Sequence, residues 1–295
     1  PCPIYFVARF SKPFKTFGGW THGQLHLTDC IEGKGCGAFV AYVTSEDEVL
    51  LLKVALSYVS IEGARLNLDT ELPHWDFDRI RNESTVVWNR WLRRIEVQGG
   101  TKEQRTKFYT DLWRSLLGGH LISDVNGQYS DMTGEKRIVR QVPIDADGQP
   151  KYPFLNAQGF WGAHWSLSLL YALAYPDITS FYCNFLVDMY RNGGLIPRGP
   201  SGGNYTFVMI GAHSTAFIVA AYMKGIRTFD IDAAYEGMRK NAFPGGLMSK
   251  AGYEHDTCEG GGIEYYMERG YIPEGNEVPT AMHVDGAAQT LEYAY

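Results

Sequence analysis

Acidic side chains are concentrated in the last third of the chain, where they could support hydrolysis. Two carboxyl groups on either side of a glycosidic bond cleave it, one acting as the acid and the other as the base. Closeness in sequence alone is weak support, because most acidic groups in loops are solvated. His255 lies between two acidic residues as a metal ligand would, but a turn closed by side-chain hydrogen bonds is the commoner outcome. The acidic residues are Glu254, Asp256, Glu259, Glu264, Glu268, Glu274, Glu277 and Asp285.

Two further segments combine aromatic, polar and glycine residues in a way that suits sugar binding. Residues 160–165 read FWGAHW. The indoles of Trp161 and Trp165 can stack on a sugar ring, and His164 can exchange a hydrogen bond with a hydroxyl group. Packing between helices uses the same residue types and is an equally good interpretation. Residues 198–205 read RGPSGGNY and lack the Gly-Lys-Ser/Thr ending of a phosphate-binding loop, so we expect a polar cleft loop there.

The composition is that of a folded protein and argues against several classes of partner. Of the 295 residues, 45% are hydrophobic and 14% aromatic, which is enough for a substantial core. A length of this order corresponds to about two domains. The net charge of −6 and the lack of a basic run argue against nucleic acid. Because no stretch of about 18 apolar residues occurs, we expect no membrane span.

The first sixty residues show the two-residue period of β-strands. Apolar residues alternate in three rows, from Ile4 to Phe10, from Ala38 to Tyr42 and from Val49 to Val59. Gly18-Gly19 and residues 33–37 are predicted as turns between strands. These rows are too few to close a sandwich or a barrel, so we expect further strands outside this sequence.

From residue 60 onward the period is that of helices. Thr101 and Gln104 have the spacing of a capping box that opens a helix ending near Leu117. A helix from residue 166 is expected to stop at Pro176, with Asp177 capping the next helix, which runs to residue 193. Two more helices are predicted over residues 214–224 and, after a cap at Asp230, up to residue 243.

The predicted helices are joined alternately by short and long connections. The long ones span residues 193–213 and 243–262, and stacked antiparallel helix pairs would gather them at one end. Loops on a rigid scaffold carry function, so that end is the expected site. Residues 287–295 form an amphipathic helix without a capping residue after it, and we expect the chain to be a piece of a longer protein.

The five cysteines show no zinc-binding spacing. Cys30 and Cys36 could close a hairpin as a disulfide, but buried free thiols are the preferred interpretation.

Several motifs together resemble glycoside hydrolase family 92, the calcium-dependent, inverting exo-α-mannosidases. The similarity extends over essentially the whole chain, and the motifs occur in the family's order. They lie at residues 6–14 (FVARFSKPF), 60–68 (SIEGARLNL), 101–117, 123–125 (SDV), 203–206, 208–211, 233–236 and 238–242.

The resemblance implies a multidomain protein with α and β parts. Residues 1–61 would form the C-terminal part of an N-terminal β-sandwich, and residues 62–100 the linker helices. Residues 101–295 would form the first, incomplete part of an (α/α)6 barrel. The remaining parts would come from the same polypeptide or from a complementing chain.

The resemblance also implies a general acid, a general base and a calcium ion that contacts the sugar. The family's acid, base and metal segments are expected beyond Tyr295, so the catalytic residues are unknown and no metal ligands are assigned within this chain. Glu274 and Glu277 share Glu-x-Asn and Gly-Asn-Glu with those segments, but the rest of the motif does not follow, which makes both weak candidates.

Three positions depart from the family pattern. Gly162 stands where many members have Asp after Trp, Gly199 where many have Trp before Pro, and Ala212 where many have Asp before His. Each would remove a group facing the sugar, and losing a buried carboxylate that binds hydroxyls weakens recognition. These changes indicate a different substrate preference, and they also leave room for a chain without activity.

The sequence therefore predicts an exo-acting α-mannosidase, α-1,2 in linkage preference, that inverts configuration with the help of calcium and acts on mannose-containing glycans such as N-glycans. A non-catalytic glycan-binding protein is the competing prediction, and a uronate lyase ranks below both. Family habit implies secretion or a periplasmic location. The residues expected to line the sugar cleft are Trp161, His164, Trp165, Arg198, Asn204 and His213.

Overall fold

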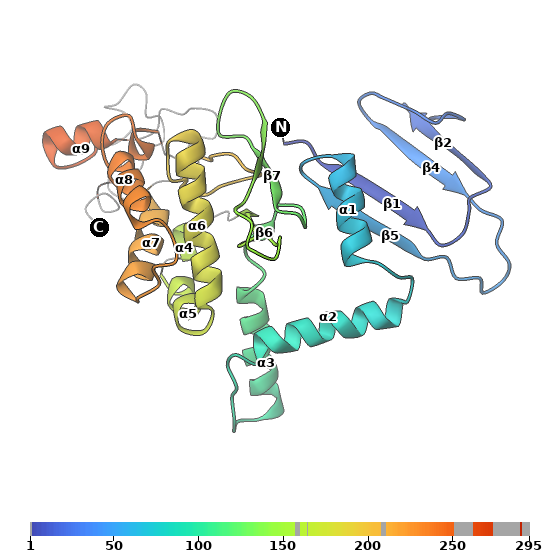
Figure 1. The fold of residues 1–295 in the computed structure, drawn as a ribbon, viewed down its shortest axis with the longest axis horizontal. Helices are drawn as coiled ribbons and strands as arrows, with labels where there is room; N and C mark the ends of the chain where they lie inside the picture. Colours follow the sequence, from blue (N-terminus) through green and yellow to red (C-terminus); the bar gives the residue numbers. More distant parts are fainter. Residues whose placement is uncertain are drawn as a thin grey trace.

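The computed structural model describes residues 2–156, 160–163, 165–207, 211–250, 262–273 and 290. The strands of residues 5–57 lie at one end of the molecule and the helices of residues 160–269 at the other (Figure 1). Residues 120–156 lie between them, and the N-terminus reaches this middle segment (Figure 1). Contacts among these three parts therefore join residues that lie far apart in sequence.

The strands near the N-terminus form two antiparallel sheets. β1 (Tyr5–Phe10) pairs with β5 (Leu52–Ser57). β2 (Thr16–Thr21) lies between β3 (Gln24–His26) and β4 (Cys36–Ala41). Each of the three predicted apolar rows overlaps a strand, respectively β1, β4 and β5, although β4 begins at Cys36, inside the turn predicted over residues 33–37.

The predicted turn at Gly18-Gly19 is wrong, because both glycines lie inside β2. A Cβ at Gly18 would lie 2.2 Å from the carbonyl oxygen of His26, and one at Gly19 would lie 2.6 Å from the Ile31 side chain. Glycine inside a strand often marks such a close approach. The two glycines thus allow residues of the following segment to pack closely on β2, and they do not reverse the direction of the strand.

α1 (Ile61–Glu71) packs against the β1–β5 pair. It begins at Ser60, whose hydroxyl accepts a hydrogen bond from a backbone amide of the first turn. Ala64 and Leu68, one turn apart, are fully buried against apolar residues of β1 and β5. The first helix of the predicted linker thus packs with the strands.

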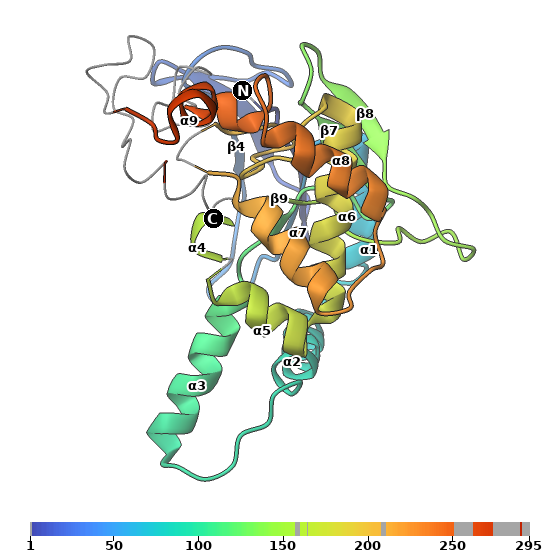
Figure 2. The ribbon, with the colours of Figure 1, turned by 90° about the vertical axis from the view of Figure 1, so that its left-hand side faces the viewer.

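α2 (Phe77–Leu92) and α3 (Lys102–Ser115) follow, and α3 projects away from the body of the molecule (Figure 2). The predicted capping box opens α3. The Thr101 hydroxyl accepts a hydrogen bond from Gln104 N at 3.3 Å, and the Gln104 side chain accepts one from Thr101 N at 2.9 Å. The local sequence signal is therefore confirmed at this helix start.

The middle segment contains short strands that the sequence did not predict. β6 (His120–Leu121) pairs with β9 (Leu155–Asn156), and β7 (Gln128–Asp131) pairs with β8 (Ile138–Gln141). The expectation that only helices follow residue 60 is wrong here. Strands of 2 to 4 residues are too short to display an apolar period.

The helices of the C-terminal half pack around an aromatic core. The described ones are α4 (Phe160–Ala163), α5 (Leu167–Ala174), α6 (Pro176–Gly193), α7 (His213–Met223), α8 (Ile231–Asn241), the 3-10 helix η1 (Leu247–Ser249) and α9 (Ile263–Arg269). α6, α7 and α8 lie side by side (Figures 1 and 2). Tyr171, Tyr182, Phe185 and Phe217 are at most 5% exposed and belong to one cluster. Many of the aromatic residues thus serve the core.

The junction between α5 and α6 corrects one predicted cap. Pro176 is the first residue of α6, and the N-cap is Tyr175, so Asp177 lies in the first turn instead of capping it. The Asp177 carboxylate accepts two hydrogen bonds from the Arg94 guanidinium, at 2.5 and 2.8 Å. Asp230 caps α8 as predicted, since its carboxylate accepts a hydrogen bond from a first-turn amide at 3.0 Å.

The described cysteines are free thiols that differ in burial. Cys183 is buried, as the preferred interpretation of the cysteines required, but Cys30 is exposed and Cys36 only half-buried. The prediction of buried thiols is therefore wrong for the Cys30 and Cys36 pair, which lies in and beside a surface hairpin.

Part of the acid-rich segment and the last predicted helix lie outside the described residues. This applies to residues 251–261, Glu274, Glu277, Asp285 and, apart from residue 290, the helix predicted at residues 287–295. Within the described ranges, Glu264 and Glu268 are exposed on α9, and no helix is long and apolar enough to cross a membrane.

Candidate functional site

The connection between α6 and α7 carries two of the predicted sugar-binding residues. It begins at Gly194, whose φ of 83° ends α6 in the left-handed conformation. The Ser214 hydroxyl of α7 and the Asn241 side-chain amide of α8 each donate a hydrogen bond to a backbone carbonyl of residues 196–197. Two helices therefore fix the path of this loop before it reaches Arg198.

Tyr205 anchors the other side of the loop. Its hydroxyl lies 2.8 Å from the Met189 carbonyl oxygen near the end of α6 and accepts a hydrogen bond from Leu195 N at 3.2 Å. Burial raises the pKa of Tyr205 above its usual value, so the phenol keeps its proton. The Thr206 hydroxyl donates to Gly199 O and closes the loop on itself. We call residues 198–206 the anchored loop.

Residues 199–203 of the anchored loop have the Gly-x-Ser-x-Gly spacing of a hydrolase nucleophile. That motif needs a sharp turn from a strand into a helix. Here the loop joins two helices, and Ser201 and Asn204 exchange backbone hydrogen bonds at 2.9 and 3.0 Å. The spacing thus belongs to a tight glycine-rich turn, and we assign no nucleophile to it.

The structure describes the side chains of four predicted sugar-binding residues. Asn204 is exposed at the tip of the turn, and Trp165 is 72% exposed between α4 and α5. Arg198 and His213 are each only 3% exposed. All four were predicted to line the sugar cleft, whereas their burial divides them into two that reach solvent and two that lie beneath the surface.

The remaining predicted positions are described in part. The side chain of Trp161 and the whole of His164 lie outside the described residues. Gly162 is exposed in α4, and a Cβ there would meet none of the described residues within 4 Å. Ala212 is the N-cap residue of α7, and Gly199 accepts the hydrogen bond of Thr206 within the anchored loop.

These positions converge in space only in part. The Ser214 hydroxyl lies 3.3 Å from Arg198 O. The start of α7, where His213 lies, therefore contacts the anchored loop at its first residue, Arg198. α4 also packs against α7. The candidate site thus consists of the anchored loop and the starts of α4 and α7, with Trp165 on the adjoining connection.

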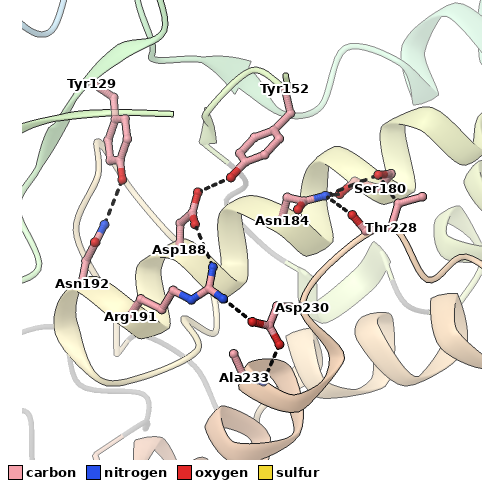
Figure 3. Close-up of polar contacts among 10 residues, drawn as sticks. All are labelled: Tyr129, Tyr152, Ser180, Asn184, Asp188, Arg191, Asn192, Thr228, Asp230 and Ala233. Atoms are coloured by element: carbon pink, nitrogen blue, oxygen red, sulfur yellow. Dashed lines mark hydrogen bonds and ion pairs between the residues drawn. The ribbon is translucent and has the colours of Figure 1, made fainter. Parts of the chain in front are cut away.

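A polar network on α6 was missed by the sequence analysis (Figure 3). The Tyr152 hydroxyl donates to the Asp188 carboxylate at 2.6 Å, and Arg191 links Asp188, at 3.8 Å, to Asp230. Burial raises the pKa of the Asp188 carboxyl and, further helped by Asp188 itself, that of Tyr152. The network ties the segment before α4 and the start of α8 to α6.

The same helix face binds two further segments (Figure 3). The Asn192 amide donates to the Tyr129 hydroxyl of β7 at 2.9 Å, and Asn184 donates to Thr228 O at 3.3 Å. Burial raises the pKa of Tyr129 to about 12. Asn184, Asp188 and Asn192 recur every fourth residue, and this polar stripe in an apolar helix is the signal that could have revealed the network.

The described residues do not fit a calcium site. Calcium takes about six to eight oxygen ligands, with carboxylates prominent among them. Within residues 2–156, 160–163, 165–207, 211–250 and 262–273, no three His, Cys, Asp or Glu side chains converge. We therefore assign no step through calcium to this part of the chain.

Structural comparison relates the chain to enzymes that are much longer. An inverting mannosidase of family GH92 from Bacteroides thetaiotaomicron VPI-5482 is 26% identical, with a TM-score of 0.77. The match covers 99% of this chain and 37% of that one. A GH92 α-mannosidase from Bacteroides thetaiotaomicron is 22% identical, with a TM-score of 0.80, and the match covers 99% and 36% of the two chains. This chain thus spans little more than a third of their length.

A third structure, a GH92 glycosyl hydrolase named ccman5, is 23% identical with a TM-score of 0.64, and the match covers 80% of this chain and 30% of the other. No curated protein matches the chain. The model of the glycosyl hydrolase family 92 catalytic domain matches residues 63–295. The match begins in α1 and includes the anchored loop, and this chain therefore belongs to glycosyl hydrolase family 92.

Proposed function

We propose that this chain supplies the glycan-binding side of an exo-acting α-mannosidase. The observation that supports the proposal most is the family match over residues 63–295, together with 26% identity to an inverting mannosidase. Residues 1–61 would belong to a β-sandwich, residues 62–100 to linker helices, and residues 101–295 to an (α/α)6 barrel. Export from the cytoplasm and a preference for α-1,2-linked mannose on N-glycans belong to the same proposal.

The chemistry proposed is hydrolysis with inversion. One carboxylic acid protonates the leaving oxygen, and a carboxylate activates a water molecule across a gap of about 6.5–9.5 Å. We assign neither role to a described residue, and Glu274 and Glu277 remain weak candidates. Calcium, where the family's ligand segments hold it, would polarise the sugar hydroxyls.

The described residues contribute recognition of the terminal sugar. The Asn204 amide at the tip of the anchored loop offers a donor and an acceptor to hydroxyl groups, and the Trp165 indole offers a face for stacking. Arg198 and His213 contribute from beneath the surface that carries Asn204 and Trp165, because both are buried where the loop meets α7. Trp161 and His164 complete the proposed cleft.

The open position at Gly162 supports an altered sugar preference. A Cβ there would meet no described atom within 4 Å, so the described residues leave room at the position where many family members have aspartate. The same observation favours the second candidate function, a glycan-binding protein without turnover.

Incubation of the protein with α-1,2-mannobiose, with and without EDTA, separates the two candidates. An active mannosidase releases mannose, and the chelator abolishes the release. A binding protein gives heat of binding in calorimetry without release. If neither heat nor release is observed, both candidates are wrong. Trp161→Ala and His164→Ala test the cleft, because unchanged kcat/KM or unchanged binding in both variants would contradict their placement.

A further inference from the structure

A buried carboxylate joins the strand end of the molecule to its middle segment. Asp124, just before β7, is 4% exposed. It accepts hydrogen bonds from the Ser57 hydroxyl of β5 and the Asn67 side-chain amide of α1, each at 2.8 Å. The end of β5 and α1 therefore meet at a carboxyl group that lies more than fifty residues further along the chain.

The partners of Asp124 hold it in a single arrangement. Asn67 also donates to Leu56 O at 2.8 Å and accepts a hydrogen bond from Val125 N at 2.9 Å. A Cβ on Gly63 would lie 2.2 Å from an Asp124 carboxylate oxygen, so only glycine leaves room for it. Buried polar groups whose partners are all present specify one geometry in a way that an apolar contact does not.

A second set of contacts at the same junction fixes β7 from its other side. The Ser130 hydroxyl donates to Tyr58 O. Arg137 donates to Ser130 Oγ at 2.9 Å, to Tyr58 O at 3.3 Å and to Val59 O. The chain around β7 is thus tied to the last residue of β5, to α1 and to the two residues that follow β5.

β7 in turn holds the anchored loop. Met132 N donates to Gly203 O at 3.0 Å, and a Cβ on Gly203 would lie 2.0 Å from Ser130 O. From the N-terminal side, the Cys2 thiol donates to Gly202 O at 3.4 Å. The turn that presents Asn204 is therefore pressed between β7 and the N-terminal segment.

We propose that Asp124 is a positioning residue for the anchored loop. It sets β7 relative to β5 and α1, and β7 sets the turn that presents Asn204 to a mannose-containing ligand. The positioning of the loop stands on the contacts above, while its consequence for ligand binding rests on the proposed function.

Hydrogen exchange on the protein tests the positioning directly. The readouts are the amides of Met132, Ser201 and Asn204, with the amide of Thr179 inside α6 as the internal reference. In Asp124→Ala, exchange of the first three is expected to rise about tenfold, the size expected when buried donors lose their acceptor, while Thr179 changes less than twofold. Asp124→Asn, which still accepts from Asn67, is expected to restore most of the protection.

Asp69→Asn is the matched control, because Asp69 lies on α1, as the Asp124 partner Asn67 does, but forms an exposed ion pair with Arg9. If Asp124→Ala changes the loop amides no more than this control, or changes Thr179 equally, Asp124 is not a positioning residue. Should Asp124→Ala fail to fold, Ser57→Ala, which removes one of the two donors to Asp124, is compared with the control by the same criterion.

Calorimetry with α-1,2-mannobiose on the same variants separates the two proposals. Weaker binding in Asp124→Ala, in proportion to its increased exchange, is the expected result. Altered exchange in a protein that binds no mannobiose would refute the proposed function and leave the positioning intact. Unchanged binding despite faster exchange would refute the link between the junction and the ligand.

Discussion

Replacing Gly203 by alanine tests whether the anchored loop depends on its close approach to β7. Gly203 has a φ of +79°, and a Cβ would lie 2.0 Å from Ser130 O, a backbone atom that cannot rotate away. Gly225 is a matched control, because its φ is +83° but a Cβ there would meet nothing within 4 Å. The two substitutions share the backbone strain and differ in the clash.

The expected magnitudes follow from these contacts. An alanine in the left-handed region costs about 1 kcal/mol, which is the whole expected effect of Gly225→Ala on the free energy of unfolding. Gly203→Ala adds about 1 kcal/mol for the lost hydrogen bond from Met132 N and about 1 kcal/mol or more for displacing the loop. We therefore expect about 3 kcal/mol in total, together with weaker mannobiose binding.

Urea unfolding followed by circular dichroism measures both variants, and calorimetry measures mannobiose binding. If Gly203→Ala destabilises the protein no more than Gly225→Ala does, the loop does not rest on β7 as described. If it destabilises by the expected amount but leaves binding unchanged, the loop is held by β7 yet takes no part in binding.

Four further substitutions test other parts of the account. Gly162→Asp is expected to leave the melting temperature nearly unchanged, because the described residues leave the position open, and to tighten mannose binding about tenfold. Unchanged binding in calorimetry would show that the missing aspartate does not alter the sugar preference. Trp165→Ala is expected to weaken binding at unchanged stability, since the indole is exposed, and a large loss of stability in urea would show that it packs instead. Burial raises the pKa of the Asp188 carboxyl in the folded protein, so the contribution of this group to the free energy of unfolding is complete below about pH 4 and is lost as the pH rises through the pKa of the folded state. Asp188→Asn should therefore flatten the fall in the free energy of unfolding from about pH 4 upward. Parallel pH profiles of the two proteins would contradict this. Leu68→Ala should cost about 2–5 kcal/mol because the side chain is fully buried against β1 and β5, and a cost under about 1 kcal/mol in urea unfolding would mean that α1 does not depend on that contact.

Sequence patterns predicted the features whose causes are local. The capping box of Thr101 and Gln104 and the cap at Asp230 depend only on residues within one turn, and both are confirmed. Gly18-Gly19 was mistaken for a turn because the carbonyl that crowds it belongs to another strand. Asp177 was mistaken for a cap because the helix starts at Pro176, which moves the N-cap two residues back to Tyr175.

The sequence identified the segments that make up the candidate site, but not which of their side chains reach the surface. The anchored loop was identified from its composition, and Asn204 and Trp165 are exposed as a sugar-binding role requires. The burial of Arg198 and His213 depends on which helices cover them, and one sequence does not contain that information. Asp124 lay within a family-like motif, but its role appears only when Ser57 and Asn67 come together around it.

Whether the anchored loop binds the sugar is tested by titrating the protein with α-1,2-mannobiose and following the backbone amide resonances. We expect saturable shifts at Gly203 and Asn204 in the anchored loop, with the amides of β1 and β5 unaffected. The absence of any shift at saturating ligand, or shifts confined to residues outside the anchored loop and the starts of α4 and α7, would contradict this expectation.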